Sequence, residues 1–122
     1  MDILVTTPKS AHKLAEEEAN FVKENPDSYW FRTLRGRPNV QTGDRVYYID
    51  NGKITGYGIV FDIETGEIQC ESTGKIYRGT NLKQREWQWL KHPIPFRGFQ
   101  GFRYVDRIPG LREVMEKNVE VI

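Results

Sequence analysis

The spacing of hydrophobic residues predicts two helices, and residues 87–92 have the two-residue alternation of a β-strand. Alanine, leucine, phenylalanine and valine recur at helical spacing over residues 9–23. Pro26 ends this helix because proline disfavours α geometry at the residue before it. Its three consecutive glutamates, residues 16–18, are interpreted as a solvated face and not as an anion site. A shorter helix is expected over residues 109–117.

Runs of β-branched and aromatic residues, separated by turn residues, predict the strands. Asn51 and Gly52 favour a two-residue hairpin turn, because both positions of that turn need positive φ. The polar residues 79–86 are expected to form a loop, and Pro93 and Pro95 to rule out a continuing central strand. The predicted strands cover residues 2–6, 29–34, 46–50, 53–62, 67–71, 75–78, 87–91 and 102–105, with a closing strand at 119–122.

Tight turns connect the four successive strands between residues 46 and 78, at residues 64–66 and 72–74 among others, and no long helix intervenes there. The prediction is therefore an α+β fold: a small curled, mostly antiparallel β-barrel flanked by an N-terminal helix and a short C-terminal helix. Gly56 and Gly58 lie inside a predicted strand and indicate a bulge, a bend or a close approach by another backbone. The chain of 122 residues is expected to form one domain, residues 1–122.

The composition argues against several classes of protein. The single cysteine, Cys70, cannot form a disulfide within the chain, and with two histidines it supplies no cysteine–histidine metal site. We therefore expect no metal and no cofactor. The first residues lack the basic and apolar regions of a signal peptide, and the longest apolar run is too short to span a membrane. A cytoplasmic protein without a membrane partner is expected.

The net charge of +1 hides two basic segments. Residues 29–61 carry four arginines and one lysine against two acids, and residues 78–107 carry five arginines and two lysines against two acids. Most of these cations are arginines, which suit planar recognition of a phosphate or a base better than lysines do.

Aromatic and basic residues are interleaved most densely in residues 87–105, and again around residues 29–37. Binding of unpaired bases needs aromatic faces for stacking and cations for the phosphate backbone. Strand alternation puts Trp87 and Trp89 on one face, either in the core or on a cleft wall, and both readings stay open because a small barrel buries most of its aromatic rings. The candidate ligand-binding residues are Trp30, Arg32, Arg35, Arg37, Arg85, Trp87, Trp89, Arg97, Gln100 and Arg103.

No spacing of the two histidines supports a catalytic triad, and no glycine-rich phosphate loop follows a strand and opens a helix. Cys70 is expected to be a buried or edge thiol and not a nucleophile. We therefore assign no catalytic residue.

Residues 42–60 read Thr-Gly-Asp-Arg-Val-Tyr-Tyr-Ile-Asp-Asn-Gly-Lys-Ile-Thr-Gly-Tyr-Gly-Ile-Val: a Gly-Asp-x-Val turn, a hairpin and a glycine-rich return strand. This pattern resembles PUA-like domains, especially their EVE and ASCH branches, and residues 93–105 are compatible with the late strand and loop of that fold. The resemblance implies a cleft that accepts RNA or a modified base. In relatives of the YTH type an aromatic cage holds a methylated base, and by position Trp30, Trp87 and Trp89 are the candidates here.

ASCH-type relatives often carry a Gly-x-Lys-x-x-Glu-x-Arg motif, and some are hydrolases. Here Gly74 and Lys75 are followed by Ile-Tyr-Arg, so the motif spacing fails and the enzyme interpretation is weakened. The leading hypothesis is a non-catalytic module that binds RNA or a modified nucleotide. The alternatives are a small hydrolase acting on a nucleoside or RNA, with Glu71, Lys75 and Glu86 as acid–base candidates, and a protein-interaction domain that presents the same rings to a partner chain.

Overall fold

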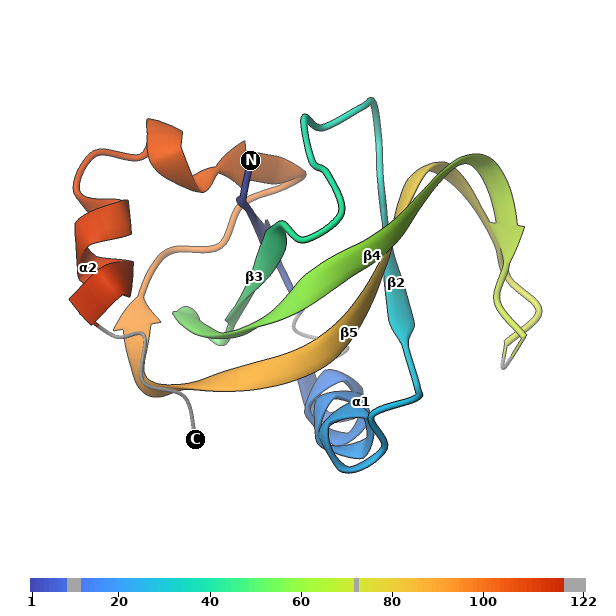
Figure 1. Ribbon diagram of the computed structural model, residues 1–122, viewed down its shortest axis with the longest axis horizontal. Coiled ribbons are helices and arrows are strands. Elements are labelled where there is room, and N and C mark those ends of the chain that lie inside the picture. The colour runs from blue at the N-terminus through green and yellow to red at the C-terminus, as the bar shows by residue number, and fades with distance from the viewer. Residues whose placement is uncertain (9–11, 72, 118–122) are drawn as a thin grey trace.

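A curled sheet of six strands organises the chain in the computed structural model, which describes residues 1–8, 12–71 and 73–117 (Figure 1). Two α-helices and one short 3₁₀ helix accompany the sheet in this part of the chain. None of the described helices is long and apolar enough to cross a membrane. In chain order the elements are β1 (Ile3–Thr6), α1 (His12–Glu24), β2 (Trp30–Leu34), β3 (Arg45–Asp50), β4 (Lys53–Gln69), β5 (Ile76–Pro95), β6 (Phe102–Tyr104), η2 (Val105–Arg107) and α2 (Leu111–Lys117).

The strands lie in the order β2-β5-β4-β3-β1-β6, and every neighbouring pair is antiparallel except β1 and β3. The parallel pair arises because the chain leaves β1, passes through α1 and β2, and returns as β3 beside β1. The hairpin between β3 and β4 has φ values of 53° at Asn51 and 77° at Gly52, as its sequence predicts. The predicted α+β architecture, with a mostly antiparallel curled sheet, is confirmed.

The predicted loop at residues 79–86 is wrong, because these residues form the middle of β5, between β2 and β4. Polar side chains tolerate this buried position when each one finds a partner. Asn81 accepts a hydrogen bond from the Thr33 hydroxyl, and the Gln84 side chain accepts one from Tyr48 at 2.8 Å. The local polarity of this segment was therefore a poor guide to its structure.

Two further boundaries differ from the prediction. Residues 64–66 are not a turn, since β4 runs through them and pairs with β5 as far as Gln69. β5 also continues past Pro93 to Pro95. β2 pairs only with residues 80–84 of β5, so beyond Leu90 the strand β5 is paired with β4 alone. The other side of β5 is an open edge there, and prolines are tolerated at such an edge. The predicted closing strand at 119–122 lies outside the described residues.

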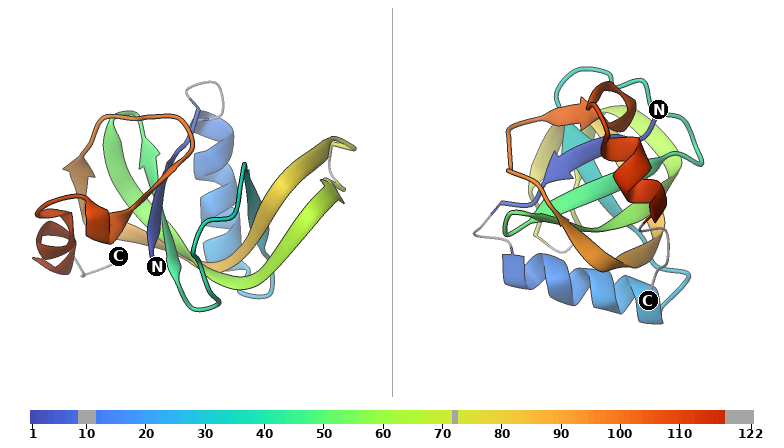
Figure 2. Two further views of the ribbon diagram at one scale, coloured as in Figure 1. Left: turned by 90° about the horizontal axis from the view of Figure 1, so that it is seen from above. Right: turned by 90° about the vertical axis from the view of Figure 1, so that its left-hand side faces the viewer.

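The outer halves of β4 and β5 form a two-stranded ribbon that projects from the rest of the molecule (Figures 1 and 2). Its tip is a turn in which the Cys70 amide donates to the carbonyl of Lys75 at 2.9 Å, and the Gly74 amide donates to the carbonyl of Cys70 at 2.7 Å. This ribbon, the arm, is therefore built by β4 and β5, which also build the core of the sheet.

Two hydrophobic clusters pack against the sheet. In the first, Ala19 and Val22 of α1 pack with the indole of Trp87, and α1 lies across the outside of the sheet (Figure 2). The second cluster includes Leu111 and Met115 of α2. The two helices thus belong to different clusters, and the first cluster reaches the candidate site.

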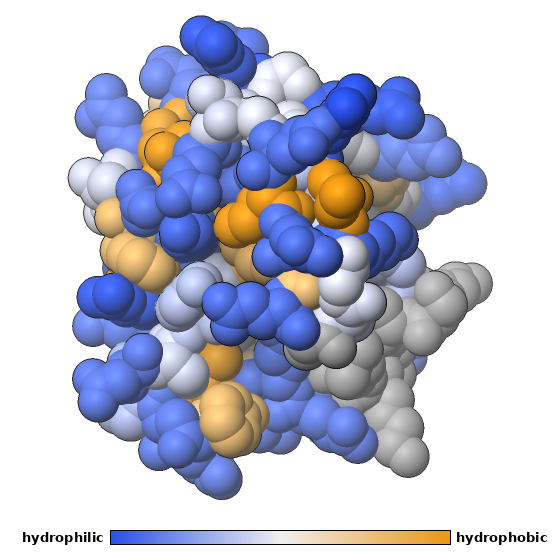
Figure 3. All heavy atoms as spheres, turned by 90° about the vertical axis from the view of Figure 1, so that its right-hand side faces the viewer, coloured by the Kyte–Doolittle hydropathy of each residue, from blue (hydrophilic) through white to orange (hydrophobic). Residues whose placement is uncertain are grey.

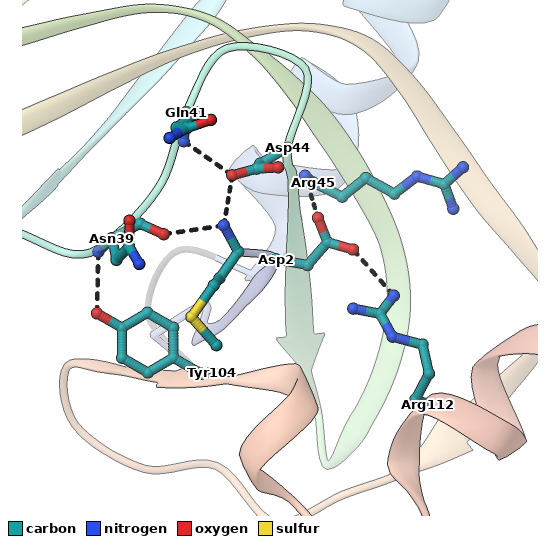
Figure 4. Close-up of polar contacts among 8 residues, drawn as sticks. Asp2, Asn39, Gln41, Asp44, Arg45, Tyr104 and Arg112 are labelled. Atoms are coloured by element: carbon teal, nitrogen blue, oxygen red, sulfur yellow. Dashed lines mark hydrogen bonds and ion pairs between the residues drawn. The ribbon is translucent and has the colours of Figure 1, made fainter.

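A group of polar contacts ties the start of β1 to α2 and β3 (Figure 4). Asp2 accepts a hydrogen bond from the backbone of Arg45 at 2.8 Å and pairs with Arg112 at 2.9 Å. Close by, the hydroxyl of Tyr104 accepts a hydrogen bond from the backbone of Asn39 at 2.9 Å. These contacts hold β6 as the edge strand beside β1, and they hold α2 against the same edge of the sheet.

A tryptophan-lined candidate binding pocket

A pocket of about 180 Å³ lies between α1 and the sheet. Its wall is formed by the segment after β1, by α1 and by strands β2, β3, β4 and β5. All three tryptophans of the chain, Trp30, Trp87 and Trp89, line it together with Tyr48. The rest of the wall consists of Phe31, of three carboxylates and one arginine, and of small residues such as Thr7, Ala15 and Thr55.

Trp87 is the central ring of the aromatic group. Its centroid lies 5.7 Å from that of Trp30, 5.1 Å from that of Trp89 and 5.4 Å from that of Tyr48. Trp87 contacts its two tryptophan neighbours edge to face, an arrangement that aromatic pairs prefer. Trp87 is only 6% exposed, whereas Trp89 and Trp30 are half-buried. The two tryptophans of β5 thus share one face, as alternation predicts, with Trp87 in the core and Trp89 nearer to solvent.

Two glycines of β4 make room for these indoles. A Cβ atom at Gly56 would collide with the Trp87 ring, and one at Gly58 would collide with the Trp30 ring. The pairing of β4 with β5 also shifts register on either side of this segment. The glycines were expected to mark a bulge or a close approach by another backbone. Bulges are present here. A Cβ atom at Gly56 would meet the backbone carbonyl of Gln88 as closely as the Trp87 ring, and at Gly58 the nearest group is the Trp30 ring.

A hydrogen-bonded chain fixes the Trp30 side of the pocket. The indole N–H of Trp30 donates to the Tyr48 hydroxyl at 3.0 Å, and this hydroxyl donates to the side-chain oxygen of Gln84 at 2.8 Å. Burial raises the pKa of Tyr48 to about 12, so the phenol keeps its proton at neutral pH. Trp30 is therefore held by a neutral, fully paired hydroxyl.

The two tryptophans of β5 differ in their hydrogen bonding. Trp89 donates from its indole nitrogen to the Asn20 side chain of α1 at 3.0 Å. The indole nitrogen of Trp87 is buried and has no acceptor among the described residues. A buried N–H without an acceptor is costly, and in most proteins such a group has a partner.

The charged residues of the pocket wall are mostly acidic. Glu16, Glu18 and Asp50 line it, against one cation, Arg32, in the part of the wall that the structure describes. Arg32 donates to the backbone carbonyl of Thr6 at 3.2 Å. Glu18 is largely exposed as a residue, yet enough protein surrounds its carboxyl group to raise its pKa above the ordinary value of 4.5. This wall does not suit a phosphate.

A shallow basic groove lies next to the pocket. Arg97 and Arg103 line it, and Arg103 stacks over the ring of Phe99 at 4.2 Å. The backbone N–H of Phe99 donates to the hydroxyl of Thr6 at 3.0 Å. The carbonyl of the same Thr6 accepts from Arg32, so Thr6 connects the loop of the groove with an arginine of the pocket wall.

The sequence matches no family model and no curated protein. Its structure is similar to solved structures. The ASCH protein of Zymomonas mobilis superposes with a TM-score of 0.58 at 14% sequence identity, covering 99% of this chain and 96% of that one. A tyrosine-to-phenylalanine variant of that protein gives a TM-score of 0.58 at 14% identity, with 99% of both chains covered. The protein has an ASCH-type, PUA-like fold.

Within this ASCH-type fold, four of the ten predicted site residues meet in one pocket: Trp30, Arg32, Trp87 and Trp89. Arg97 and Arg103 line the adjoining groove. The other four lie outside both. Arg35 and Arg37 are exposed on the connection between β2 and β3, Gln100 is exposed on the loop before β6, and Arg85 stacks over the ring of Phe61 at 3.8 Å.

The acid–base candidates of the hydrolase hypothesis do not gather at the pocket of this ASCH-type fold. Glu71 and Lys75 lie at the tip of the arm, beyond the ends of β4 and β5. Glu86 is exposed in β5, where its backbone has a positive φ of 59°. Among the residues that the structure describes, no group of histidine, cysteine and carboxylate side chains is placed to hold a metal ion.

Sequence reasoning missed three contributors to the pocket: Tyr48, Asp50 and the glutamates of α1. Residues 16–18 are exposed, as a solvated face requires, but Glu16 and Glu18 also line the pocket. A local signal existed only for Tyr48, which is followed two residues later by Asp50 on the same face of β3. No local pattern indicates that this face of β3 lies beside α1.

Proposed function

We propose that the protein is a non-catalytic module that binds RNA, or a modified nucleotide, by taking one base into the tryptophan pocket. The observation that carries this proposal is the gathering of all three tryptophans around one pocket of about 180 Å³. An apolar cavity of about 150 Å³ holds benzene, so this partly open pocket matches a single flat ring system. Each base stacked on an aromatic side chain contributes roughly 1–3 kcal/mol to binding.

The distribution of charge supports a particular orientation of the nucleotide. The carboxylates of the wall disfavour a phosphate inside the pocket, whereas Arg97 and Arg103 offer cations just beyond Thr6. The base therefore enters the pocket, and the sugar–phosphate backbone runs over Thr6 toward the basic groove. The PUA-like resemblance, which implies a cleft for RNA or a modified base, agrees with this orientation.

Tryptophan fluorescence tests the proposal directly, because every tryptophan of the chain lines the pocket. Titration at low salt with single-stranded RNA and DNA of mixed sequence, and with modified nucleosides, should quench the emission. Trp89→Ala should weaken binding by roughly tenfold or more, in line with about 1–3 kcal/mol per stacked base. Tyr29→Ala, at an exposed ring outside the pocket, is the matched control and should bind as the wild type does.

Two results would overturn the proposal. If no ligand of this panel binds, the pocket does not accept a base. If ligand recovered after long incubation is chemically changed, and Trp89→Ala abolishes that change, the protein is an enzyme and not a binding module.

The protein-interaction hypothesis has less support from the surface. Exposed large hydrophobic residues are scattered over α1, the segment before β2, the arm and α2. The face that carries the arm shows small hydrophobic groups separated by hydrophilic side chains (Figure 3). Protein-binding sites usually have one larger continuous apolar patch.

A further inference from the structure

The pocket combines aromatic rings with carboxylates, and this pairing points to the charge of its ligand. We propose that the pocket selects a positively charged, N-methylated nucleobase over its neutral parent base, with Glu18 as the carboxylate that recognises the charge. This inference rests on the proposed function, because it specifies which base the tryptophan pocket accepts.

The first argument is the aromatic wall. Trp30, Trp87 and Trp89 all line one small space, with the rings of Trp30 and Trp89 each edge to face with that of Trp87. A cation near an indole face is attracted by the ring quadrupole, and aromatic cages recognise methylated cations in this way. A neutral base stacks on the same rings without this additional attraction.

The second argument is the balance of charges around the space. Three carboxylates, of Glu16, Glu18 and Asp50, face one guanidinium among the described residues of the wall. That guanidinium, of Arg32, also donates to the carbonyl of Thr6. The wall therefore has an excess of negative charge, which a cationic base neutralises and a neutral base does not. The raised pKa of the Glu18 carboxyl shows that it is partly removed from water, which strengthens its interaction with a cation.

Two cationic nucleosides carry the charge that these two features favour. In 7-methylguanosine, the base has a positive charge on a flat ring and N–H groups for a carboxylate. The base of 1-methyladenosine has the positive charge but no carbonyl oxygen, so it separates the effect of the charge from any effect of the carbonyl group.

Calorimetric titration of nucleosides tests the inference without any phosphate present. In mildly acidic buffer, 7-methylguanosine should bind at least tenfold more tightly than guanosine. Glu18→Gln should lower the affinity for 7-methylguanosine about tenfold and leave guanosine unchanged, because glutamine keeps the shape and loses the charge. Glu17→Gln is the matched control, since Glu17 is exposed on the same helix and does not line the pocket.

A second measurement keeps the inference testable if Glu18→Gln folds poorly. The wild-type protein should also bind 1-methyladenosine at least tenfold more tightly than adenosine, because the charge of the base sets the preference. Equal binding of these two nucleosides would overturn the selection of a cationic base. Circular dichroism confirms that each variant is folded.

The outcomes distinguish this inference from the proposed function. If 7-methylguanosine and guanosine bind equally, or if single-stranded RNA binds and neither nucleoside does, the selection of a cationic base is wrong while the binding function stands. If neither the nucleosides nor the RNA bind, the proposed function itself fails. A preference for 7-methylguanosine that Glu18→Gln leaves intact would also overturn the role given to Glu18.

Discussion

At the scale of single residues, the positions of two of the three pocket indoles depend on a glycine beside the ring. Trp87 packs over Gly56, and Trp30 packs over Gly58. Strand glycines lower β-propensity, so their presence in the middle of β4 needs a compensating reason. Here the reason is space: any side chain at either position would occupy the volume that the indoles fill.

Replacing Gly58 by alanine is expected to displace the Trp30 ring. Gly58→Ala should lower the free energy of unfolding by about 1–3 kcal/mol, the usual cost of adding volume to a packed core. It should also weaken base binding, because Trp30 must move away from the Tyr48 hydroxyl to which it donates. Urea unfolding followed by circular dichroism measures the first effect, and fluorescence titration measures the second.

A double-mutant cycle checks the cause of that destabilisation. Trp30→Phe removes the outer ring atoms that the new methyl group would meet. Gly58→Ala should therefore cost less in the Trp30→Phe background than in the wild type. Equal costs in the two backgrounds would mean that the β4 backbone or the nearby Gln84 side chain, and not the indole, is the source of the strain.

At the scale of elements, structure that depends on neighbours in the sequence could be predicted, and structure that depends on contacts with distant segments could not. The φ values of Asn51 and Gly52, the extent of α1 and the shared face of Trp87 and Trp89 follow from neighbours in the sequence. The strand at residues 79–86 does not, because the partners of its buried polar side chains lie on β2 and β3. For the same reason the predicted residues include the three tryptophans that line the pocket but not Tyr48 or Glu18, which also line it.

The short helix α2 offers a prediction at this scale, because one residue anchors it. Arg112 pairs with Asp106 at 2.7 Å and with Asp2 at 2.9 Å. Arg112→Met should lower the free energy of unfolding by about 1–2 kcal/mol at neutral pH. Hydrogen bonds to charged groups usually contribute more than this, and the value is reduced here because both ion pairs are partly exposed to solvent. Lys117→Met, at an exposed position of the same helix, should change it little.

The effect of Arg112→Met should depend on pH. The hydrogen bond from Arg112 lowers the pKa of Asp106 below its ordinary value of 3.8. A carboxyl with a lowered pKa in the folded state stabilises the protein above its unfolded-state pKa, and this stabilisation disappears as the pH falls through the folded-state value. The difference between wild type and variant in urea unfolding should therefore shrink in strongly acidic buffer. A difference that stays constant with pH would contradict the assigned pairing.

At the scale of the whole molecule, a net charge of +1 conceals two neighbouring regions of opposite sign. Thr6 contacts Arg32 of the acidic pocket wall and Phe99, over which Arg103 of the groove stacks. In the proposed function the two regions have different tasks: the pocket recognises the base, and the groove attracts the backbone. Phosphate contacts release counterions, so the salt dependence of RNA binding should come from the groove.

The double variant Arg97→Ala/Arg103→Ala tests this division. For single strands, the slope of log affinity against log salt changes by about 0.7 for each phosphate that the protein no longer neutralises. The double variant should therefore bind single-stranded RNA more weakly at low salt, with a slope shallower by about 0.7–1.4 if each arginine neutralises up to one phosphate. Its affinity for a nucleoside should equal that of the wild type, because a nucleoside has no phosphate. Arg85→Ala removes an arginine that stacks on Phe61 outside the groove, and it should leave the slope unchanged. A double variant that keeps the wild-type slope would place the backbone elsewhere on the surface.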